Sequence, residues 1–178
     1  ALSSAASDVY KRQPYDMVYS EIYGMNQVSV QDVLHILEKN GVTVEQVIQL
    51  PYIRDDVFNY LPVTEINRDF GCDYQIQEGE FLNLFQYNLE DGYEHNIQPV
   101  STVTISGDRK LQSVGTDVKI LFNQNPTFAD KTLIINDSDF EKLSADITGS
   151  AGIANLFQFQ NWEDSYAGVC EVKEYLQE

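Results

Sequence analysis

Helical periodicity is confined to three short parts of this chain, and most of the rest has the composition of short β-strands. Apolar residues recur at helical spacing in residues 29–40, 137–146 and 161–177. Ser29 and Asn161 stand where N-caps are expected, and Gly41 follows the first helix as a terminator. Strands grouped between a few helices predict an α+β fold, in which these helices cover a mostly antiparallel sheet. A length of 178 residues suits one domain, which we place at residues 14–178.

The predicted strands are short and rich in β-branched and aromatic residues. They cover residues 16–24, 42–50, 132–135 and 153–159, with more strands within 103–105 and 114–122. Pro51 and Pro62 predict edge strands or irregular chain between them, since proline cannot donate a ladder hydrogen bond. Asp91-Gly92 predicts a hairpin turn, and Ser106-Gly107-Asp108 predicts a second turn.

Residues 1–13 differ from the rest of the chain. The stretch from Asp8 to Gln13 resembles the translated transposon end used in sequencing libraries, and a natural flexible leader is the alternative. Residues 1–13 are therefore not counted as part of the folded domain. No run of about 20 apolar residues occurs in the chain, so no segment is predicted to span a membrane.

The charge balance is strongly acidic, with 28 Asp and Glu against 11 Lys and Arg and a net charge of −17. Such a surface repels nucleic acid phosphates and attracts cations, cationic peptides or a basic protein face. We therefore expect no nucleic acid partner. Plain solubility is the alternative explanation of the acidity.

Residues 69–108 contain no Lys or Arg, and aromatic residues are interleaved with acids along this region. Aromatic faces and carboxylates together suit the recognition of cations. The alternative is ordinary strand patterning, with aromatics toward the core and acids toward solvent. We predict a hairpin subdomain here. Its candidate ligand-binding residues are Asp73, Tyr74, Glu78, Glu80, Tyr87, Glu90, Asp91, Tyr93 and Glu94.

Signals for catalysis are poor. His35 lies within the first predicted helix and His95 in a polar stretch after the Asp91-Gly92 turn, far apart in sequence. Known nucleophile, phosphate-binding and zinc-protease motifs do not occur. Pairs of carboxylates carry little information in so acidic a chain. We predict no catalytic residue and no cofactor, and interpret the chain as a binding or coupling domain.

Metal and disulfide chemistry are equally weakly indicated. Cys72 and Cys170 lack zinc-site spacing, and two separate thiols are favoured over a disulfide that would close a loop of about 100 residues. Asn88, Glu90 and Asp91 gather near a turn and could bind calcium, although a solvated hairpin tip is favoured. No metal site is predicted.

The stretch from Thr132 to Leu143 resembles a segment of FtsX-like (MacB-type) ABC transporter permeases. In their extracytoplasmic domains, a hydrophobic strand leads into a helix start of the form S-D-F/Y-x-K-L. The matching residues here are Ser138, Asp139, Phe140, Lys142 and Leu143. Further similarity in residues 14–50, 119–123 and 159–176 brings the coverage to about half of the chain.

This resemblance implies an extracellular domain placed between two transmembrane helices of a bacterial permease. Its partners would be those helices and a cytoplasmic ATPase subunit, and its role mechanical coupling or ligand sensing. In bacitracin-export-type relatives, the external domain takes part in antimicrobial peptide sensing, and many such peptides are cationic. The alternatives are a secreted or surface-anchored adhesin or carbohydrate-binding module, a small immunity-type protein, and a hydrolase.

Overall fold

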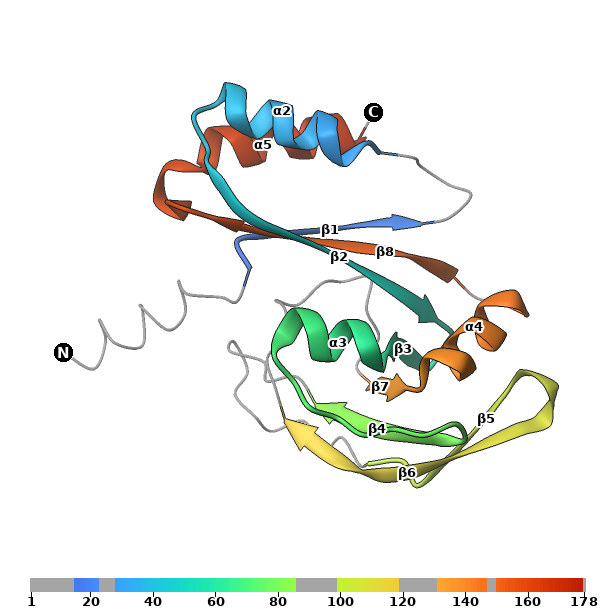
Figure 1. Ribbon diagram of the computed structural model, residues 1–178. Helices are drawn as coiled ribbons and strands as arrows, with labels where there is room; N and C mark the ends of the chain where they lie inside the picture. Colours follow the sequence, from blue (N-terminus) through green and yellow to red (C-terminus); the bar gives the residue numbers. More distant parts are fainter. Residues whose placement is uncertain (1–14, 23–27, 86–98, 119–130, 147–149, 178) are drawn as a thin grey trace.

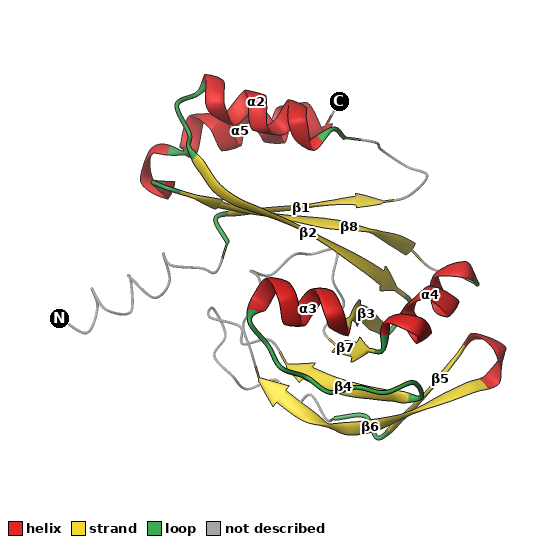
Figure 2. Ribbon diagram, in the orientation of Figure 1, coloured by secondary structure: helices red, strands yellow, loops and turns green. Residues whose placement is uncertain are grey.

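A computed structural model describes residues 15–22, 28–85, 99–118, 131–146 and 150–177 (Figure 1). Its described strands form one eight-stranded sheet in the order β1-β8-β2-β3-β7-β4-β6-β5. The pairs β3–β7 and β4–β6 are parallel, and the other strand pairs are antiparallel. The predicted α+β fold with a mostly antiparallel sheet is therefore confirmed (Figure 2).

The strands are β1 (Met17–Ile22), β2 (Val44–Arg54), β3 (Phe58–Pro62), β4 (Glu80–Phe85), β5 (Thr102–Ile105), β6 (Arg109–Val118), β7 (Lys131–Ile135) and β8 (Ser150–Phe159). The α-helices are α2 (Val30–Lys39), α3 (Val63–Phe70), α4 (Asp137–Ala145) and α5 (Tyr166–Gln177). Two 3₁₀ turns, η1 (Ser106–Asp108) and η2 (Trp162–Asp164), precede β6 and α5. No described helix is long and apolar enough to cross a membrane.

One half of the molecule, which we call the α2–α5 half, consists of β1, β8 and β2 with helices α2 and α5 on one face (Figure 1). Its core includes Leu37 of α2, Phe157 of β8 and Val172 of α5, all fully buried. Gly168 allows α5 to approach α2 closely, since a Cβ atom there would lie 3.0 Å from Val42 Cγ2 and 3.4 Å from Leu37 Cδ2. Apolar packing therefore holds this half together.

The other half, the α3–α4 half, contains β3, β7, β4, β6 and β5 with helices α3 and α4. Helix α3 lies between the two halves of the sheet (Figure 1), and Ile66 packs in one core with Leu50 of β2 and Leu84 of β4. Helix α4 contributes Phe140 and Leu143 to a separate core with β5, β6 and β7. The sheet passes from one half to the other where the end of β2 pairs with β3.

The proline prediction is right for Pro51, which lies where β2 has no partner strand on its other side among the described residues, and wrong for β3, which pairs with both β2 and β7 and is followed by a helix. Pro51 lies where β2 pairs with β8 alone, since β3 pairs only with Ile53 and Arg54 of β2. Pro62 ends β3 and is the N-cap residue of α3, where a missing N–H has little cost. Helix α3, which we did not predict, ends at Gly71 in the left-handed conformation, with φ of 63°.

The predicted helix starts are partly confirmed. Asn136 caps α4, and its Oδ1 accepts a hydrogen bond of 2.9 Å from the Ser138 N–H. Ser29 precedes α2 without a side-chain capping bond. Asn161 precedes η2, and α5 begins only at Tyr166, because the chain makes a 3₁₀ turn first.

The remaining expectations divide between described and undescribed residues. The predicted turn at residues 106–108 connects β5 and β6 as an antiparallel hairpin. Cys72 and Cys170 are both free and half-buried, in agreement with two separate thiols. The Asp91-Gly92 hairpin lies outside the described residues.

Candidate functional site

Part of the predicted ligand-binding region is described as residues 71–80, which we call the acidic segment. It connects α3 to β4, and its side chains alternate between the protein and the solvent. Tyr74 and Ile76 pack against the core between the two halves. Asp73, Gln75, Gln77 and Glu78 are exposed. The segment therefore presents a row of polar side chains on an extended backbone.

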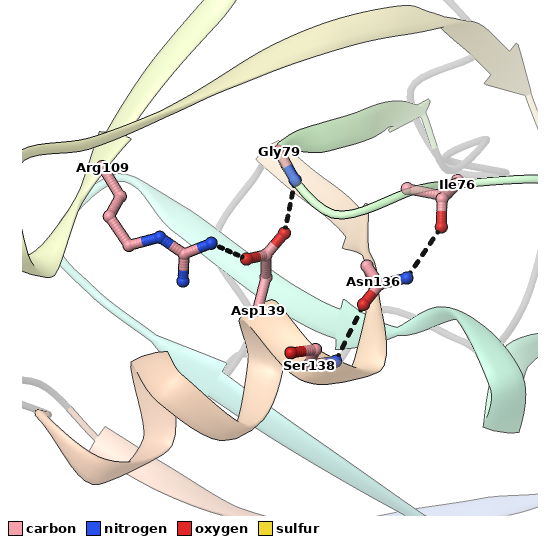
Figure 3. A network of polar contacts seen from close by, with 6 residues as sticks. All are labelled: Ile76, Gly79, Arg109, Asn136, Ser138 and Asp139. Atoms are coloured by element: carbon pink, nitrogen blue, oxygen red, sulfur yellow. Dashed lines mark hydrogen bonds and ion pairs between the residues drawn. The ribbon is translucent and has the colours of Figure 1, made fainter.

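Two asparagines hold the backbone of the acidic segment. The Tyr74 N–H donates to Asn67 Oδ1 at 2.9 Å, and Asn67 Nδ2 donates to the Tyr74 carbonyl at 3.0 Å. Asn136 Nδ2 donates to the Ile76 carbonyl at 3.0 Å (Figure 3). Asn136 also caps α4, so one side chain ties the helix start to the segment. Backbone groups that are satisfied in this way fix the exposed row in place.

A buried carboxylate anchors the far end of the segment. Asp139 of α4 is 0% exposed, and its Oδ2 accepts a hydrogen bond of 2.8 Å from the Gly79 N–H (Figure 3). Its Oδ1 is paired with Arg109 Nη2 at the start of β6. The Gly79 carbonyl accepts from the Gln112 N–H at 2.8 Å. Asp139 thus joins α4, β6 and the acidic segment, and the guanidinium compensates its buried charge.

Tyr74 forms the closest polar contact of the segment. Its hydroxyl donates to Asp117 Oδ2 of β6 at 2.5 Å. Burial raises the pKa of Tyr74, and the hydrogen bond to Asp117 raises it further. The hydroxyl therefore remains a donor at neutral pH. Sequence reasoning missed Asp117, because the parallel pairing of β4 with β6 brings it to this place and leaves no local signal.

Only some of the predicted site residues can be placed. Glu80 is half-buried and accepts from the Gln77 N–H at 2.8 Å, so it holds the turn before β4. Asp73 has only a contact of 3.4 Å from Gln75 Nε2, and Glu78 is exposed. The predicted residues Tyr87, Glu90, Asp91, Tyr93 and Glu94 lie outside the described residues.

The carboxylates of the segment lack basic partners within the described part of the chain. The ion pairs there join Lys39 to Glu171, Arg68 to Asp69, and Arg109 to Asp139. None involves Asp73, Glu78, Glu80 or Asp117. This surface therefore attracts cations, and its geometry suits binding through charge and hydrogen bonds.

Other chemistry has little support among the residues that the structure describes. No group of three or more His, Cys, Asp or Glu side chains there could hold a metal ion. The proposed calcium ligands Asn88, Glu90 and Asp91 lie outside the described ranges, as does His95. His35 is exposed on α2.

No protein-family model matches this chain, and no curated protein matches its sequence. Among solved structures, the chain is similar to a crystal structure named "Putative Lipoprotein from Bacillus anthracis", with a TM-score of 0.52 and 10% sequence identity. The similarity covers 81% of this chain and 86% of that chain. At this identity the likeness shows the α+β fold alone.

Proposed function

We propose that this chain is a non-catalytic extracellular domain of an FtsX-like (MacB-type) ABC transporter permease, which binds cationic peptides and couples that binding to export. Its partners are the transmembrane helices of the same permease and the cytoplasmic ATPase subunit. It lies on the outer face of the bacterial cell membrane.

The placement of the acidic segment carries this proposal. The first described strand, β1, and the last helix, α5, both belong to the α2–α5 half (Figure 1). The acidic segment belongs to the other half, with its polar row exposed. An inserted domain needs its two ends on one side and its ligand surface elsewhere, and this arrangement suits that need.

Two further observations support the proposal. The residues of the permease resemblance have a structural task here, since Asp139 anchors the acidic segment and Phe140 and Leu143 pack in the α4 core. The structural neighbour is named a putative lipoprotein, which is consistent with a surface location. Charge complementarity then favours a cationic ligand.

Titration of the domain with an octalysine peptide tests the binding part of the proposal. We expect saturable binding at about 20 mM NaCl that weakens strongly at about 150 mM, since salt screens exposed charges. The double variant Asp73→Asn/Glu78→Gln should bind several-fold more weakly. The matched variant Glu163→Gln/Asp164→Asn removes two exposed acids from the α2–α5 half and should bind like the wild type. Equal and negligible affinity at both salt concentrations would contradict the proposed binding of cationic peptides.

The full-length gene tests the permease part separately. Hydrophobic membrane-spanning runs on both sides of this domain are expected. A cell-wall anchor or repeated modules in their place would favour the adhesin alternative and leave the peptide titration as an independent result.

A further inference from the structure

A second row of polar side chains, formed by Tyr19, Asn155 and Gln49 and distinct from the exposed row of the acidic segment, crosses the α2–α5 half on the sheet face that the two helices cover. Tyr19 of β1 is paired in register with Asn155 of β8, and Asn155 is paired with Gln49 of β2. Gln49 Nε2 donates to Asn155 Oδ1 at 3.1 Å, so these two side chains lie on the same face. Tyr19 packs in the core with α2 and α5, which identifies the face as the helix-covered one.

Two polar atoms of this row are buried and have no hydrogen-bond partner among the residues that the structure describes. Asn155 is 0% exposed and its Nδ2 has none, and Tyr19 is 8% exposed and its hydroxyl has none. A buried polar group without a partner costs about 1–3 kcal/mol. Native folds rarely tolerate two such groups on paired residues unless they serve a purpose. The row is therefore the strongest indication of a binding site in the described part of this half.

The surroundings of the row define the chemistry of a ligand. Glu21 lies two residues farther along β1, on the same face as Tyr19, and Tyr175 of α5 packs in the same core as Tyr19. Burial raises the pKa of Tyr19, and the charges of Glu21 and Tyr175 raise it further. Tyr175 in turn donates to Asp32 Oδ2 at 2.9 Å. Asn155 Nδ2 is a donor, the Tyr19 hydroxyl can donate or accept, and the Glu21 carboxylate accepts. A hydroxyl group, which both donates and accepts, fits this mixed set better than a charged group does.

The row is open to solvent at its β2 end. Gln49 is exposed, and β3 pairs with β2 at Ile53 and Arg54, so none of the described strands lies beside Gln49 on this edge of β2. Glu21, farther along β1, is half-buried. A small ligand could reach Asn155 by displacing the Gln49 side chain, which forms a single hydrogen bond of 3.1 Å with it.

We infer that Tyr19, Asn155 and Gln49, with Glu21 at the rim, form a binding site for a small uncharged polyhydroxylated molecule of the monosaccharide class. The site lies in the half opposite the acidic segment and does not depend on the proposed function. The Tyr19 ring also stacks on Phe157, with centroids 5.6 Å apart and planes at 23°, which fixes the hydroxyl in position.

Amide-resolved NMR titration of the whole chain with glucose, galactose, mannose and N-acetylglucosamine tests this site. At least one sugar is expected to give saturable shifts at residues 19, 21, 49 and 155. Tyr19→Phe and Asn155→Leu should each weaken that binding about tenfold, the effect of one lost hydrogen bond. Tyr166→Phe removes a hydroxyl from a tyrosine in the same half that is 81% exposed, and should leave binding unchanged.

The stability of the sugar-free Tyr19→Phe protein separates a ligand site from a structural contact. Its melting temperature should equal or exceed that of the wild type, since no described residue forms a hydrogen bond with the hydroxyl. The inference is overturned if no sugar shifts the row, if Tyr19→Phe binds as tightly as the wild type, or if Tyr19→Phe melts lower. Tyr19→Phe alone decides the outcome if Asn155→Leu does not fold.

Discussion

The two halves of the molecule are held together by different means. In the α2–α5 half, packing between helices and sheet is mostly apolar, apart from the buried polar side chains of Tyr19 and Asn155, and the helix-to-helix polar contacts, such as Lys39 to Glu171 and Tyr175 to Asp32, lie at the surface. In the α3–α4 half, buried or half-buried polar side chains bond to distant backbone. Asn83, for example, donates to the Val100 carbonyl at 2.9 Å and accepts from its N–H at 3.0 Å.

This difference shows how one sheet can combine a stable packed half, the α2–α5 half, with a half that holds an exposed binding segment in a fixed geometry. Apolar packing tolerates small shifts, whereas an amide that bonds both backbone groups of a residue fixes a loop in one geometry. Asn67 does this for Tyr74, and Asp139 fixes Gly79. We therefore expect substitutions in the α2–α5 half to lower global stability. Substitutions of Asn67 or Asp139 should in addition make the acidic segment mobile.

Asp139→Ala should have the largest effect. It leaves the half-buried Arg109 guanidinium unpaired and frees the Gly79 N–H, at a cost of about 3 kcal/mol in the free energy of unfolding. Chemical denaturation measures this change. Glu141→Ala, an exposed acid on the same helix, should cost about 0.5 kcal/mol or less. A similar small cost for both variants would show that Asp139 is no anchor.

Leu37→Ala should come next, at a similar cost of about 3 kcal/mol, because it opens a cavity under α2 where the side chain is fully buried. Hydrogen exchange should show faster opening throughout the α2–α5 half. Leu34→Ala, on the same helix at a half-buried position, serves as the control and should cost clearly less. If Leu37→Ala made amide exchange faster only in the acidic segment, the proposed difference between the two halves would be wrong.

Asn67→Ala should cost about 2 kcal/mol, since it leaves the Tyr74 N–H and carbonyl without their partner. Its signature is local, with faster amide exchange in residues 72–77 and little change in α2 and α5. Asn67→Asp keeps the acceptor and loses the donor, so exchange rates between those of wild type and Asn67→Ala are expected. Equally faster amide exchange across the whole molecule would contradict a local role of Asn67 in holding the acidic segment.

Glu65→Gln should have the smallest effect and the opposite sign. Burial raises the pKa of Glu65, the charge of Asp137 raises it further, and Arg68 partly opposes this. A carboxyl whose pKa is higher in the folded state favours folding when protonated, so the ionised group at pH 7 opposes it. The substitution should stabilise the protein by about 0.5 kcal/mol at pH 7 and by less near pH 4. Equal changes at both pH values would rule out this ionisation effect.

The sequence predicted the α2–α5 half better than the other half, for physical reasons. The Val33 and Leu37 stripe of α2 and the β-branched run of β2 are local patterns that packing preserves. The α3–α4 half depends on contacts between distant residues. Tyr74 meets Asp117 only through the parallel β4–β6 pairing, and Asn67 reaches Tyr74 only because α3 forms.

Candidate residues were predicted by type and region, and their roles came from the fold. Acidity and aromatic content indicated residues 69–108, which include the exposed Asp73 and Glu78. Neither property could distinguish these from Glu80, which holds its own turn. The Asp139 anchor was visible only as part of a resemblance, because no local pattern indicates which buried backbone N–H a carboxylate will meet.

Hydrogen exchange of the domain with and without octalysine at low salt measures directly whether a cationic peptide binds the acidic segment and leaves the α2–α5 half unchanged. We predict slower exchange in the acidic segment and around Asp117, with the amides of α2, α5 and β8 unchanged. Slower exchange in the α2–α5 half with none in the acidic segment would contradict this prediction.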